Sequence, residues 1–256
     1  DTINLIDDDK IKQESDIPLD DKNVYDMISN GDTSGVFQLE SGGMRVFLQN
    51  MKPECFEDII AAISLYRPGP MDSIPKYVRG KQDPSSVSYI TPQLKPILDV
   101  TYGCIVYQEQ VMQIVRDLAG YSMGRSDLVR RAMSKKKHDI MEQERQYFIY
   151  GMKDEQGNQI VPGCIMNGID KNIANQIFDE MNAFASYAFN KSHAAAYGVL
   201  SVQTAWLKYY YPVEFMAAIL NSFLDRSDKI SAYVQYCRSN KITILPPNIN
   251  HSFKKF

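Results

Sequence analysis

The chain has 256 residues, a hydrophobic share of 44% and a formal net charge of −3, which fit a folded protein with a sizeable core in one or two domains. Because the chain is slightly acidic overall, any contact with nucleic acid must come from a local basic patch rather than from the whole surface. No apolar run reaches membrane-spanning length, and four widely spaced cysteines without a C-x-x-C pattern favour reduced thiols in a cytoplasm over a disulfide framework or a zinc site.

The first part of the chain is expected to alternate helices with three breaks. Residues 1–21 are polar and rich in Asp and predict a loose opening segment, after which helical spacing of apolar residues begins near Asp21. The stretch RPGPMDS at 67–73 predicts a stiff turn between two helices, because its two prolines lack N–H groups and restrict the residues before them. Further breaks are expected in the Pro- and Ser-rich stretch at 82–96 and in DEQGNQIVPG at 154–163.

The predicted fold class is mainly α, with a few short strands in the N-terminal half. The strand candidates are two short apolar pieces, GVFQL at 35–39 and GCIVY at 103–107. The remainder after Gly168 is expected to be almost wholly helical, and Pro212 is expected to open a helix as its first residue. Helices are predicted there at about 171–187, 192–211, 212–224 and 227–240.

No metal site is predicted from the residues. The three histidines are scattered, and the sequence contains neither an HExxH motif nor a Walker A loop. Asp7, Asp8 and Asp9 form an obvious carboxylate cluster, but three consecutive side chains in a polar segment point in different directions. We therefore interpret this cluster as a solvated acidic run.

A dense basic cluster is the first candidate for binding chemistry. The stretch GRSDLVRRAMSKKKHD at 124–139 predicts a helix with Ser126 as its N-cap and lysines in its last turn, where the helix dipole favours cations. One interpretation is a surface that contacts phosphates; the other is a solvated helix face with Asp127 and Arg131 as an i, i+4 pair. The cations of the cluster are Arg125, Arg130, Arg131, Lys135, Lys136 and Lys137.

The second candidate is the stretch FNKSHAAAYG at 189–198. Its alanines predict a helix that begins near Ser192, and free N–H groups at that helix start, beside Lys191 and His193, would form a phosphate site. A polar stripe on one face of the helix would present hydroxyls, a ring and a cation, or would simply be the wet face of an amphipathic helix. The stripe consists of His193, Tyr197, Ser201, Thr204 and Lys208, and the neighbouring apolar stripe of Ala195, Val199, Val202, Trp206 and Tyr209.

Five motifs together closely resemble the alpha subunits of bacterial DNA polymerase III, the C-family replicative polymerases, and they occur in that family's order. They are GDTSGVFQLES (31–41), SLYRPGPMDSIPKYVRGK (64–81), VYQEQVMQI (106–114), LVRRAMSKKK (128–137) and FNKSHAAAYGVLSVQTAWLKYYYPVEFMAAIL (189–220). The resemblance implies that the chain is a fingers region cut from a longer protein. It implies an opening segment at 1–21 that follows the palm, an N-terminal part of the fingers at 22–168 and a C-terminal helical part at 169–256 that ends near a helix-hairpin-helix region.

The resemblance also implies chemistry. The palm's aspartates and the Mg²⁺ ions they hold would lie before Asp1, so no catalytic or metal-binding residue is expected in this chain. The fingers would grip the incoming deoxynucleoside triphosphate, with Tyr197 as a candidate for stacking near the nascent base pair. The candidates for phosphate contact are Lys191, His193, Arg130, Arg131, Lys135, Lys136 and Arg67, the last of which has a packing or capping role as its alternative.

The implied partners are primer-template DNA, the deoxynucleoside triphosphate and, in the full protein, the sliding clamp and other replisome subunits, with no membrane. The competing hypothesis from another class is a non-enzymatic helical module that binds single-stranded nucleic acid or a protein partner. The residues encoded upstream of Asp1 would discriminate the two, because a palm with paired aspartates supports the polymerase.

Overall fold

The computed structural model describes residues 1–7, 11–135, 138–185, 189–250, 252 and 256, so that Asp8, Asp9, Lys136 and Lys137 lie outside the described residues. Among the described residues the fold is mainly α, as predicted, with one antiparallel sheet of two short strands. The elements are α1 (Lys22–Ser29), α2 (Gly42–Met51), α3 (Phe56–Leu65), α4 (Ile74–Gln82), α5 (Lys95–Leu98), α6 (Gln108–Ala119), α7 (Met123–Ser134), α8 (His138–Tyr150), β1 (Met152–Lys153), β2 (Gln159–Val161), α9 (Lys171–Ala185), α10 (Lys191–Tyr210), α11 (Pro212–Ser222) and α12 (Ser227–Ser239).

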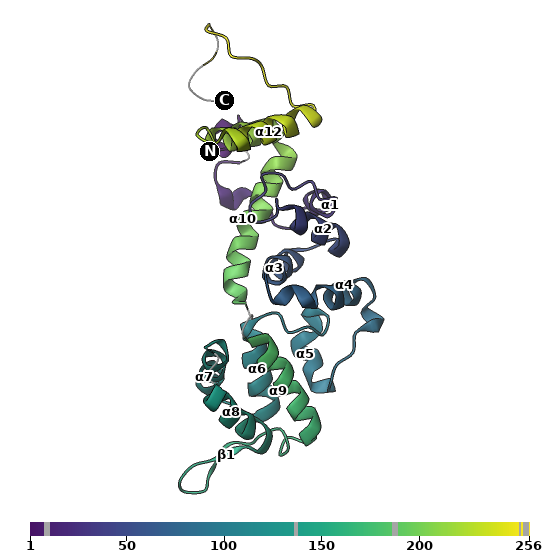
Figure 1. Ribbon diagram of the computed structural model, residues 1–256, viewed down its shortest axis with the longest axis vertical. Helices are drawn as coiled ribbons and strands as arrows, with labels where there is room; N and C mark the ends of the chain where they lie inside the picture. Colours follow the sequence, from purple (N-terminus) through teal and green to yellow (C-terminus); the bar gives the residue numbers. More distant parts are fainter. Residues whose placement is uncertain (8–10, 136–137, 186–188, 251, 253–255) are drawn as a thin grey trace. The chain divides into compact units, whose positions relative to one another are not determined.

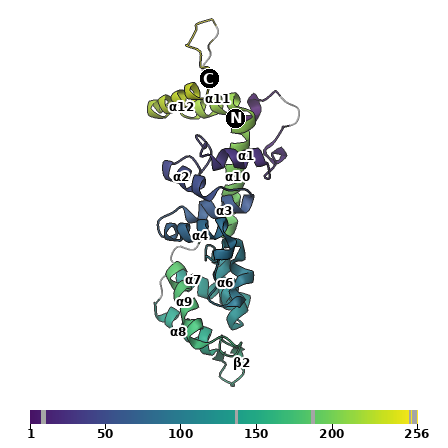
Figure 2. The same cartoon turned by 90° about the vertical axis from the view of Figure 1, so that its right-hand side faces the viewer.

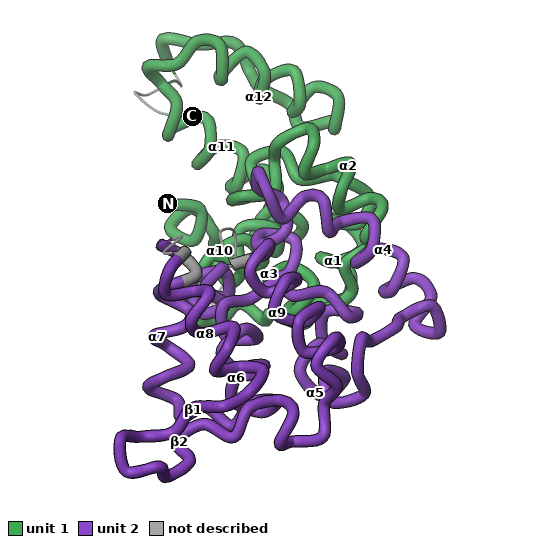
Figure 3. The backbone as a smooth tube through the Cα atoms, turned by 60° about the horizontal axis from the view of Figure 1, so that its bottom comes forward, with its two compact units in different colours: residues 1–60, 196–256 green, residues 61–195 purple. Residues whose placement is uncertain are grey.

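The chain divides into two compact units, which Figure 3 colours separately. Unit 1 consists of Asp1–Ile60 and Ala196–Phe256, and unit 2 consists of Ala61–Ala195. The chain therefore passes from one unit to the other within α3 and again within α10. The sequence analysis divides the chain after residues 21 and 168. That division describes parts of the fingers region of the family, and it stays a prediction.

In unit 1, α1 and α2 lie side by side (Figure 1) and each begins at a side-chain cap. The Asp21 carboxylate accepts a hydrogen bond from the Asn23 N–H at 2.9 Å, and the Ser41 hydroxyl accepts one from the Met44 N–H at 3.3 Å. These caps satisfy N–H groups that a helix start otherwise leaves unpaired. The core of this unit includes the buried side chains of Val24, Ile28, Leu39, Leu48, Met51, Val202, Phe215 and Met216.

The strand predicted at 35–39 is wrong, because this segment is a series of turns. Gly35 and Gln38 have positive φ angles of 76° and 62°, which no β-strand accommodates. Side chains also take the hydrogen bonds that a sheet would need, since the Thr204 hydroxyl accepts from the Phe37 N–H at 3.1 Å and the Thr33 hydroxyl donates to the Leu39 carbonyl at 2.6 Å. Val36 and Leu39 are nevertheless buried and Phe37 is half-buried, which explains why the run looked like a strand.

In unit 2 the core is formed mainly by α6 together with α7, α8 and α9 (Figure 2). The buried face of α6 carries Val111, Ile114 and Leu118, which recur at helical spacing. Phe148 of α8 and Phe178 of α9 are fully buried, with ring centroids 5.6 Å apart. This packing fixes the positions of the first residues of α6, from which the candidate site is built.

The strand predicted at 103–107 is also wrong, apart from an isolated parallel bridge between Tyr107 and Phe189. The Gln110 side chain accepts hydrogen bonds from the N–H groups of Val106 and Tyr107, at 2.8 and 3.0 Å, and so replaces a partner strand. The sheet forms instead within 154–163 and just before it, where a break was expected. There β1 and β2 pair as a hairpin whose turn includes Gly157 at a φ of 86°.

The helix breaks and helix starts predicted from prolines lie where the sequence places them. The RPGP stretch contains Gly69 at a φ of 103° and a short 3₁₀-helix, Pro70–Ser73, between α3 and α4, and Pro212 is the first residue of α11. Ser126, by contrast, is not an N-cap. The Ser122 hydroxyl accepts the Arg125 N–H at 3.3 Å, and the buried Ser126 hydroxyl donates back to the Ser122 carbonyl. The N-cap is therefore Ser122, one helical turn earlier than predicted. The prediction was based on the charged residues, and the residues of α7 before Arg125 are uncharged.

Among the described residues, none of the helices combines the length and the apolar character needed to cross a membrane.

Candidate functional site

The first residues of α6 and α10 lie next to each other in unit 2. The Gln108 N–H donates to the Phe189 carbonyl at 2.9 Å, and the Phe189 N–H donates to the Val106 carbonyl at 3.4 Å. These two backbone hydrogen bonds hold together two segments that are about 80 residues apart in the chain. The two helix starts are thereby adjacent, and each carries a partial positive charge.

Helix α10 begins at Lys191, one residue before the predicted start. The Asn190 side-chain oxygen caps the helix by accepting the His193 N–H at 2.8 Å. The Lys191 N–H donates to both carboxylate oxygens of Glu109, at 3.1 Å each, and the Asn190 amide donates to the same carboxylate at 3.1 Å. The prediction of free amides at this helix start is therefore wrong for Lys191 and His193.

Three of the side chains predicted to contact phosphates lie against aromatic rings beside the starts of α6 and α10. The Lys191 ammonium is 5.2 Å from the centroid of the Tyr107 ring, and the Arg67 guanidinium is 3.8 Å from the centroid of the Phe189 ring. The His193 ring meets Phe189 edge to face at 5.3 Å. Such contacts orient a cation, and the Arg67 Nε also donates to the Ser64 carbonyl at 3.3 Å. Burial lowers the pKa of Arg67, but an arginine remains charged at neutral pH.

Helix α7 contributes Arg130 to the same region. Its guanidinium donates to the Gln108 side-chain oxygen at 2.9 Å and pairs with Asp127 at 2.6 Å. Arg131 also pairs with Asp127, at 2.7 Å, and its side chain is 64% exposed. Hydrogen bonding to Arg130 lowers the pKa of Asp127. The predicted i, i+4 pair therefore exists, and Asp127 offsets part of the positive charge of the cluster.

Arg125, which the sequence groups with these cations, faces inward instead. Its guanidinium pairs with the buried Glu144 carboxylate at 2.7 Å and lies 5.3 and 5.0 Å from the ring centroids of Tyr121 and Tyr147. The Tyr121 hydroxyl donates to the same carboxylate at 2.9 Å. Arg125 thus anchors α7 to α8 and does not belong to an exposed basic surface.

The remaining predicted residues lie elsewhere. Lys135 is exposed just after α7, and Lys136 falls outside the described residues. Tyr197 belongs to unit 1, where its half-buried ring lies 5.2 Å from that of Phe37. The structure therefore gathers Arg67, Arg130, Lys191 and His193 around the start of α6.

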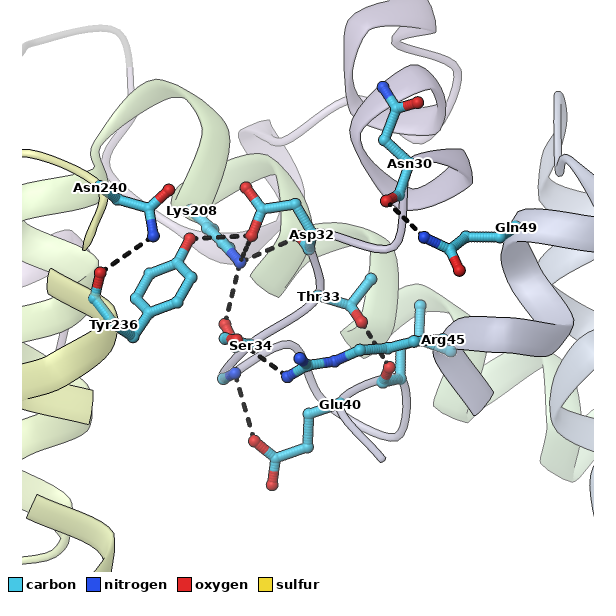
Figure 4. Close-up of polar contacts among 12 residues, drawn as sticks. Asn30, Asp32, Thr33, Ser34, Glu40, Arg45, Gln49, Lys208, Tyr236 and Asn240 are labelled. Carbon is cyan, nitrogen blue, oxygen red and sulfur yellow. Dashed lines mark hydrogen bonds and ion pairs between the residues drawn. The ribbon is translucent and has the colours of Figure 1, made fainter. Parts of the chain in front are cut away.

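The polar stripe predicted on α10 is buried at Ser201 and Lys208, half-buried at Tyr197 and Thr204, and exposed at His193. The Ser201 hydroxyl is buried and donates to the Tyr197 carbonyl at 3.0 Å. The Lys208 side chain is 3% exposed, and its ammonium bonds Asp32 and Ser34, as Figure 4 shows. Tyr209, assigned to the apolar stripe, is exposed. The prediction that this stripe is exposed fails at Ser201 and Lys208, because hydroxyl groups and even a lysine ammonium can be buried when each has a hydrogen-bond partner.

Sequence reasoning missed Gln108 and Glu109, which connect the predicted cations. Their side chains hold Arg130 and the first residues of α10, respectively. A signal was available in VYQEQV, where polar residues in the first turn of a helix face outward and can accept hydrogen bonds from neighbouring helix starts. Nothing in the local sequence, however, identifies the partner of either side chain.

A separate cleft of about 370 Å³ lies beside the RPGP turn in unit 2. Its charged lining residues are Asp72, Lys76 and Glu180, and none of the predicted phosphate ligands lines it. The Lys76 ammonium already donates to the Gly103 carbonyl at 3.0 Å. Mixed charge with two carboxylates does not suit a triphosphate, so the cleft is not the candidate site.

The candidate site is therefore a cationic surface on unit 2, formed by Arg67, Arg130, Lys191 and His193 over the start of α6. Its donors suit a ligand with several negative charges, such as a chain of phosphates. Among the described residues no group of three or more His, Cys, Asp and Glu side chains could hold a metal ion.

Comparison with known proteins gives consistent matches. A family model described as the bacterial DNA polymerase III alpha subunit finger domain matches residues 1–156. The DNA polymerase III subunit alpha of Thermus aquaticus is 48% identical over 241 residues, which cover 92% of this chain and 19% of that protein. The subunits of Staphylococcus epidermidis (strain ATCC 12228) and Staphylococcus aureus (strain Mu50) are each 47% identical over 236 residues, 92% of this chain and 21% of each protein. The chain thus spans about a fifth of the length of these curated relatives.

Proposed function

The chain belongs to the family of bacterial DNA polymerase III alpha subunits, and on this premise we propose that it forms the fingers portion of a template-dependent replicative DNA polymerase. The full-length protein would be a DNA-directed DNA polymerase, in which a primer 3′-hydroxyl attacks the α-phosphate of a deoxynucleoside triphosphate. Two Mg²⁺ ions would support that reaction, and in this proposal a palm region of the full-length protein would hold them. Membership of the family favours this function over a non-enzymatic binding module.

Within that protein, the unit 2 surface binds the phosphates of the incoming nucleotide. The observation that carries this proposal is the convergence of Arg67, Arg130, Lys191 and His193, which come from three segments of the chain, on the start of α6 and the adjacent Phe189. Cations held in fixed directions contribute electrostatic stabilisation and orientation without the cost of arranging them during the reaction. Arg131, Lys135 and Lys136 would also contact phosphates, those of the nucleotide or those of the DNA backbone.

The other implied contacts are part of the same proposal. Tyr197 would stack near the nascent base pair, and template DNA would be bound along the fingers. The three-part division into 1–21, 22–168 and 169–256 would describe the opening segment and the two parts of the fingers. The full protein would act in the cytoplasm with the sliding clamp and other replisome subunits.

The direct test is Lys191→Ala in the full-length polymerase, measured by steady-state nucleotide incorporation. A charge-assisted hydrogen bond to phosphate is worth about 1.5–3 kcal/mol, so kcat/KM for the nucleotide should fall roughly ten- to a hundredfold. The dissociation constant for primer-template DNA should change much less. Lys153→Ala is the matched control, because Lys153 is an exposed lysine of unit 2 in β1, away from the site. If Lys191→Ala leaves both kcat and the nucleotide KM intact, the proposed role is wrong.

A further inference from the structure

The Glu109 carboxylate occupies the junction between the α6 and α10 helix starts, and no role in the reaction follows for it from the family motifs quoted above. It is a carboxylate within a group of cations that we propose to bind phosphates. We propose that Glu109 is a positioning residue: it holds the first turn of α10 so that Lys191 and His193 project toward the incoming nucleotide. This inference rests on the proposed function.

The hydrogen bonds support a positioning role because one carboxylate controls several groups at once. Both of its oxygens accept the Lys191 N–H, and one of them also accepts the Asn190 side-chain amide. Asn190 in turn accepts the His193 N–H at 2.8 Å. Glu109 therefore fixes the backbone of Lys191 directly and that of His193 through Asn190.

The charge of Glu109 also suits its place. It lies in the first turn of α6 and at the start of α10, where the partial positive charges of two helices meet. Its neighbour Gln108 uses its side chain to hold Arg130 at 2.9 Å, so two consecutive residues position cations from two different helices. A rigid first turn of α6 is a suitable base for both, since its buried face is packed in the core of unit 2.

The contrary possibility is that Glu109 competes with phosphate for the Lys191 amide. The two roles predict opposite effects of truncation, because removal of a competing anion tightens nucleotide binding whereas removal of a support weakens it. Glu109→Gln separates them further. Glutamine keeps an oxygen that can accept the Lys191 N–H but removes the negative charge. If Glu109 competes with phosphate, this substitution should tighten nucleotide binding. If Glu109 supports the start of α10, nucleotide binding should be largely preserved.

The experiment measures nucleotide incorporation and primer-template binding by the full-length polymerase carrying Glu109→Ala or Glu109→Gln. We expect Glu109→Ala to raise the nucleotide KM about tenfold, with kcat at saturating nucleotide within about threefold of the parent, because the cations are displaced but not removed. Glu109→Gln should stay within about threefold of the parent in both parameters. The control is Glu155→Ala, which truncates an exposed glutamate in the hairpin turn of the same unit and should change nothing.

A double-mutant cycle with Lys191→Ala tests whether Glu109 acts through α10. If it does, adding Glu109→Ala to the Lys191→Ala variant should lower kcat/KM by less than the tenfold expected in the parent, since the main cation it positions is already gone. Full additivity would overturn the inference, as would tighter nucleotide binding by Glu109→Ala or an unchanged KM.

Retained primer-template affinity and kcat in Glu109→Ala show that the variant is folded. If Lys191→Ala itself has no effect, the proposed function fails, whereas an effective Lys191→Ala beside a silent Glu109→Ala rejects only the role of Glu109.

Discussion

The ammonium of Lys208 lies 2.6 Å from the Asp32 carboxylate, although the lysine side chain is 3% exposed and the aspartate 43%. Lys208 also donates to the backbone carbonyls of Asp32 and Ser34, at 2.9 and 3.1 Å, and the Tyr236 hydroxyl donates to the same carboxylate at 2.8 Å (Figure 4). Burial lowers the pKa of Lys208, while Asp32 acts in the opposite direction. The contacts of this lysine fasten the turn at residues 32–34 to α10 and α12 within unit 1.

Replacing Lys208 by Met should therefore destabilise the protein. The substitution removes three hydrogen bonds, and it leaves two carbonyls without the ammonium while the Asp32 carboxylate keeps the Tyr236 hydroxyl. The expected loss is about 2–4 kcal/mol of unfolding free energy. The matched control is Lys22→Met, which breaks another Lys–Asp pair of 2.6 Å, with Asp26, whose side chains are 84% and 58% exposed. Chemical unfolding should show almost no change for the control. Equal losses for the two variants would contradict the assignment of Lys208 as a buried anchor.

A second stability prediction concerns the C-terminus of α6, where Gly120 has a φ of 77°. An added Cβ would lie 2.6 Å from Pro162 Cδ, and the left-handed backbone itself costs a non-glycine residue about 1–2 kcal/mol. Gly120→Ala should therefore lower the unfolding free energy by at least that amount. Gly124→Ala serves as the comparison, because this glycine lies within α7 with nothing near its Cβ position. Alanine is the better helix former, so that variant should be neutral or slightly stabilised in the same unfolding assay.

The C-terminal helices were predictable because local signals agree there. Pro212 suits the first turn of a helix, and the apolar residues on either side of it keep a helical period, so the predicted bounds agree with the structure to within a few residues. The RPGP turn was predictable for a similar reason, since proline excludes helix interior whatever the tertiary context. Such signals depend only on neighbours in the chain.

The arrangement of the candidate site was not predictable in the same way. The partner of the Lys191 amide is Glu109, 82 residues away, and the partner of Lys208 is Asp32, 176 residues away. Periodicity placed Lys208 on a polar stripe, but only tertiary packing decides whether such a stripe is wet or buried. GVFQL failed as a strand for a related reason, because a short apolar run is buried equally well in a turn that side chains support.

The stability of the protein should fall at alkaline pH through its buried thiols. Burial raises the pKa of Cys164 to about 12 from its ordinary value of 9.0. Between these values the unfolded thiol loses its proton while the folded one keeps it, so stability declines as the pH rises, by up to about 1.4 kcal/mol per pH unit for one thiol. Below pH 9 neither state titrates and Cys164 adds no slope.

Cys164→Ala tests this effect in urea unfolding between pH 7 and 11. The variant should show a shallower alkaline decline than the parent, and the two should have the same slope from pH 7 to 8, whatever the cost of the substitution itself. Cys104, whose pKa burial raises to about 11, should account for part of the decline that remains. An unchanged alkaline slope in Cys164→Ala would show that this thiol does not titrate differently in the two states.

The exposed part of the basic cluster can be tested through the salt dependence of binding. If Arg131 and Lys135 contact phosphates, their joint replacement by alanine should reduce the slope of log K against log salt by about one to two, because fewer counterions are released. The measurement is primer-template and nucleotide affinity of the full-length polymerase over a range of salt. Lys95→Ala with Lys153→Ala removes two exposed lysines elsewhere in unit 2 and keeps the change of net charge equal. A slope that falls equally in both double variants would mean that net charge alone determines the salt dependence. An unchanged slope in the Arg131 and Lys135 double variant would mean that these residues lie on a solvated helix face and do not contact phosphates.

Substitutions that keep or remove charge at the start of α10 should separate binding geometry from electrostatics. Lys191→Arg should recover only part of the nucleotide kcat/KM lost in Lys191→Ala, because a planar guanidinium and a compact ammonium do not fit one phosphate geometry equally well, even though both can lie over the Tyr107 ring. His193→Ala should lower kcat/KM in the same direction but less than Lys191→Ala, since an imidazole ring has fewer hydrogen-bond donors than an ammonium. Both side chains are at the first turn of the helix, and Asn190 and Glu109 hold the backbone there, so thermal melting should barely shift. A large drop in melting temperature with unchanged nucleotide kinetics would instead identify Lys191 as a structural residue.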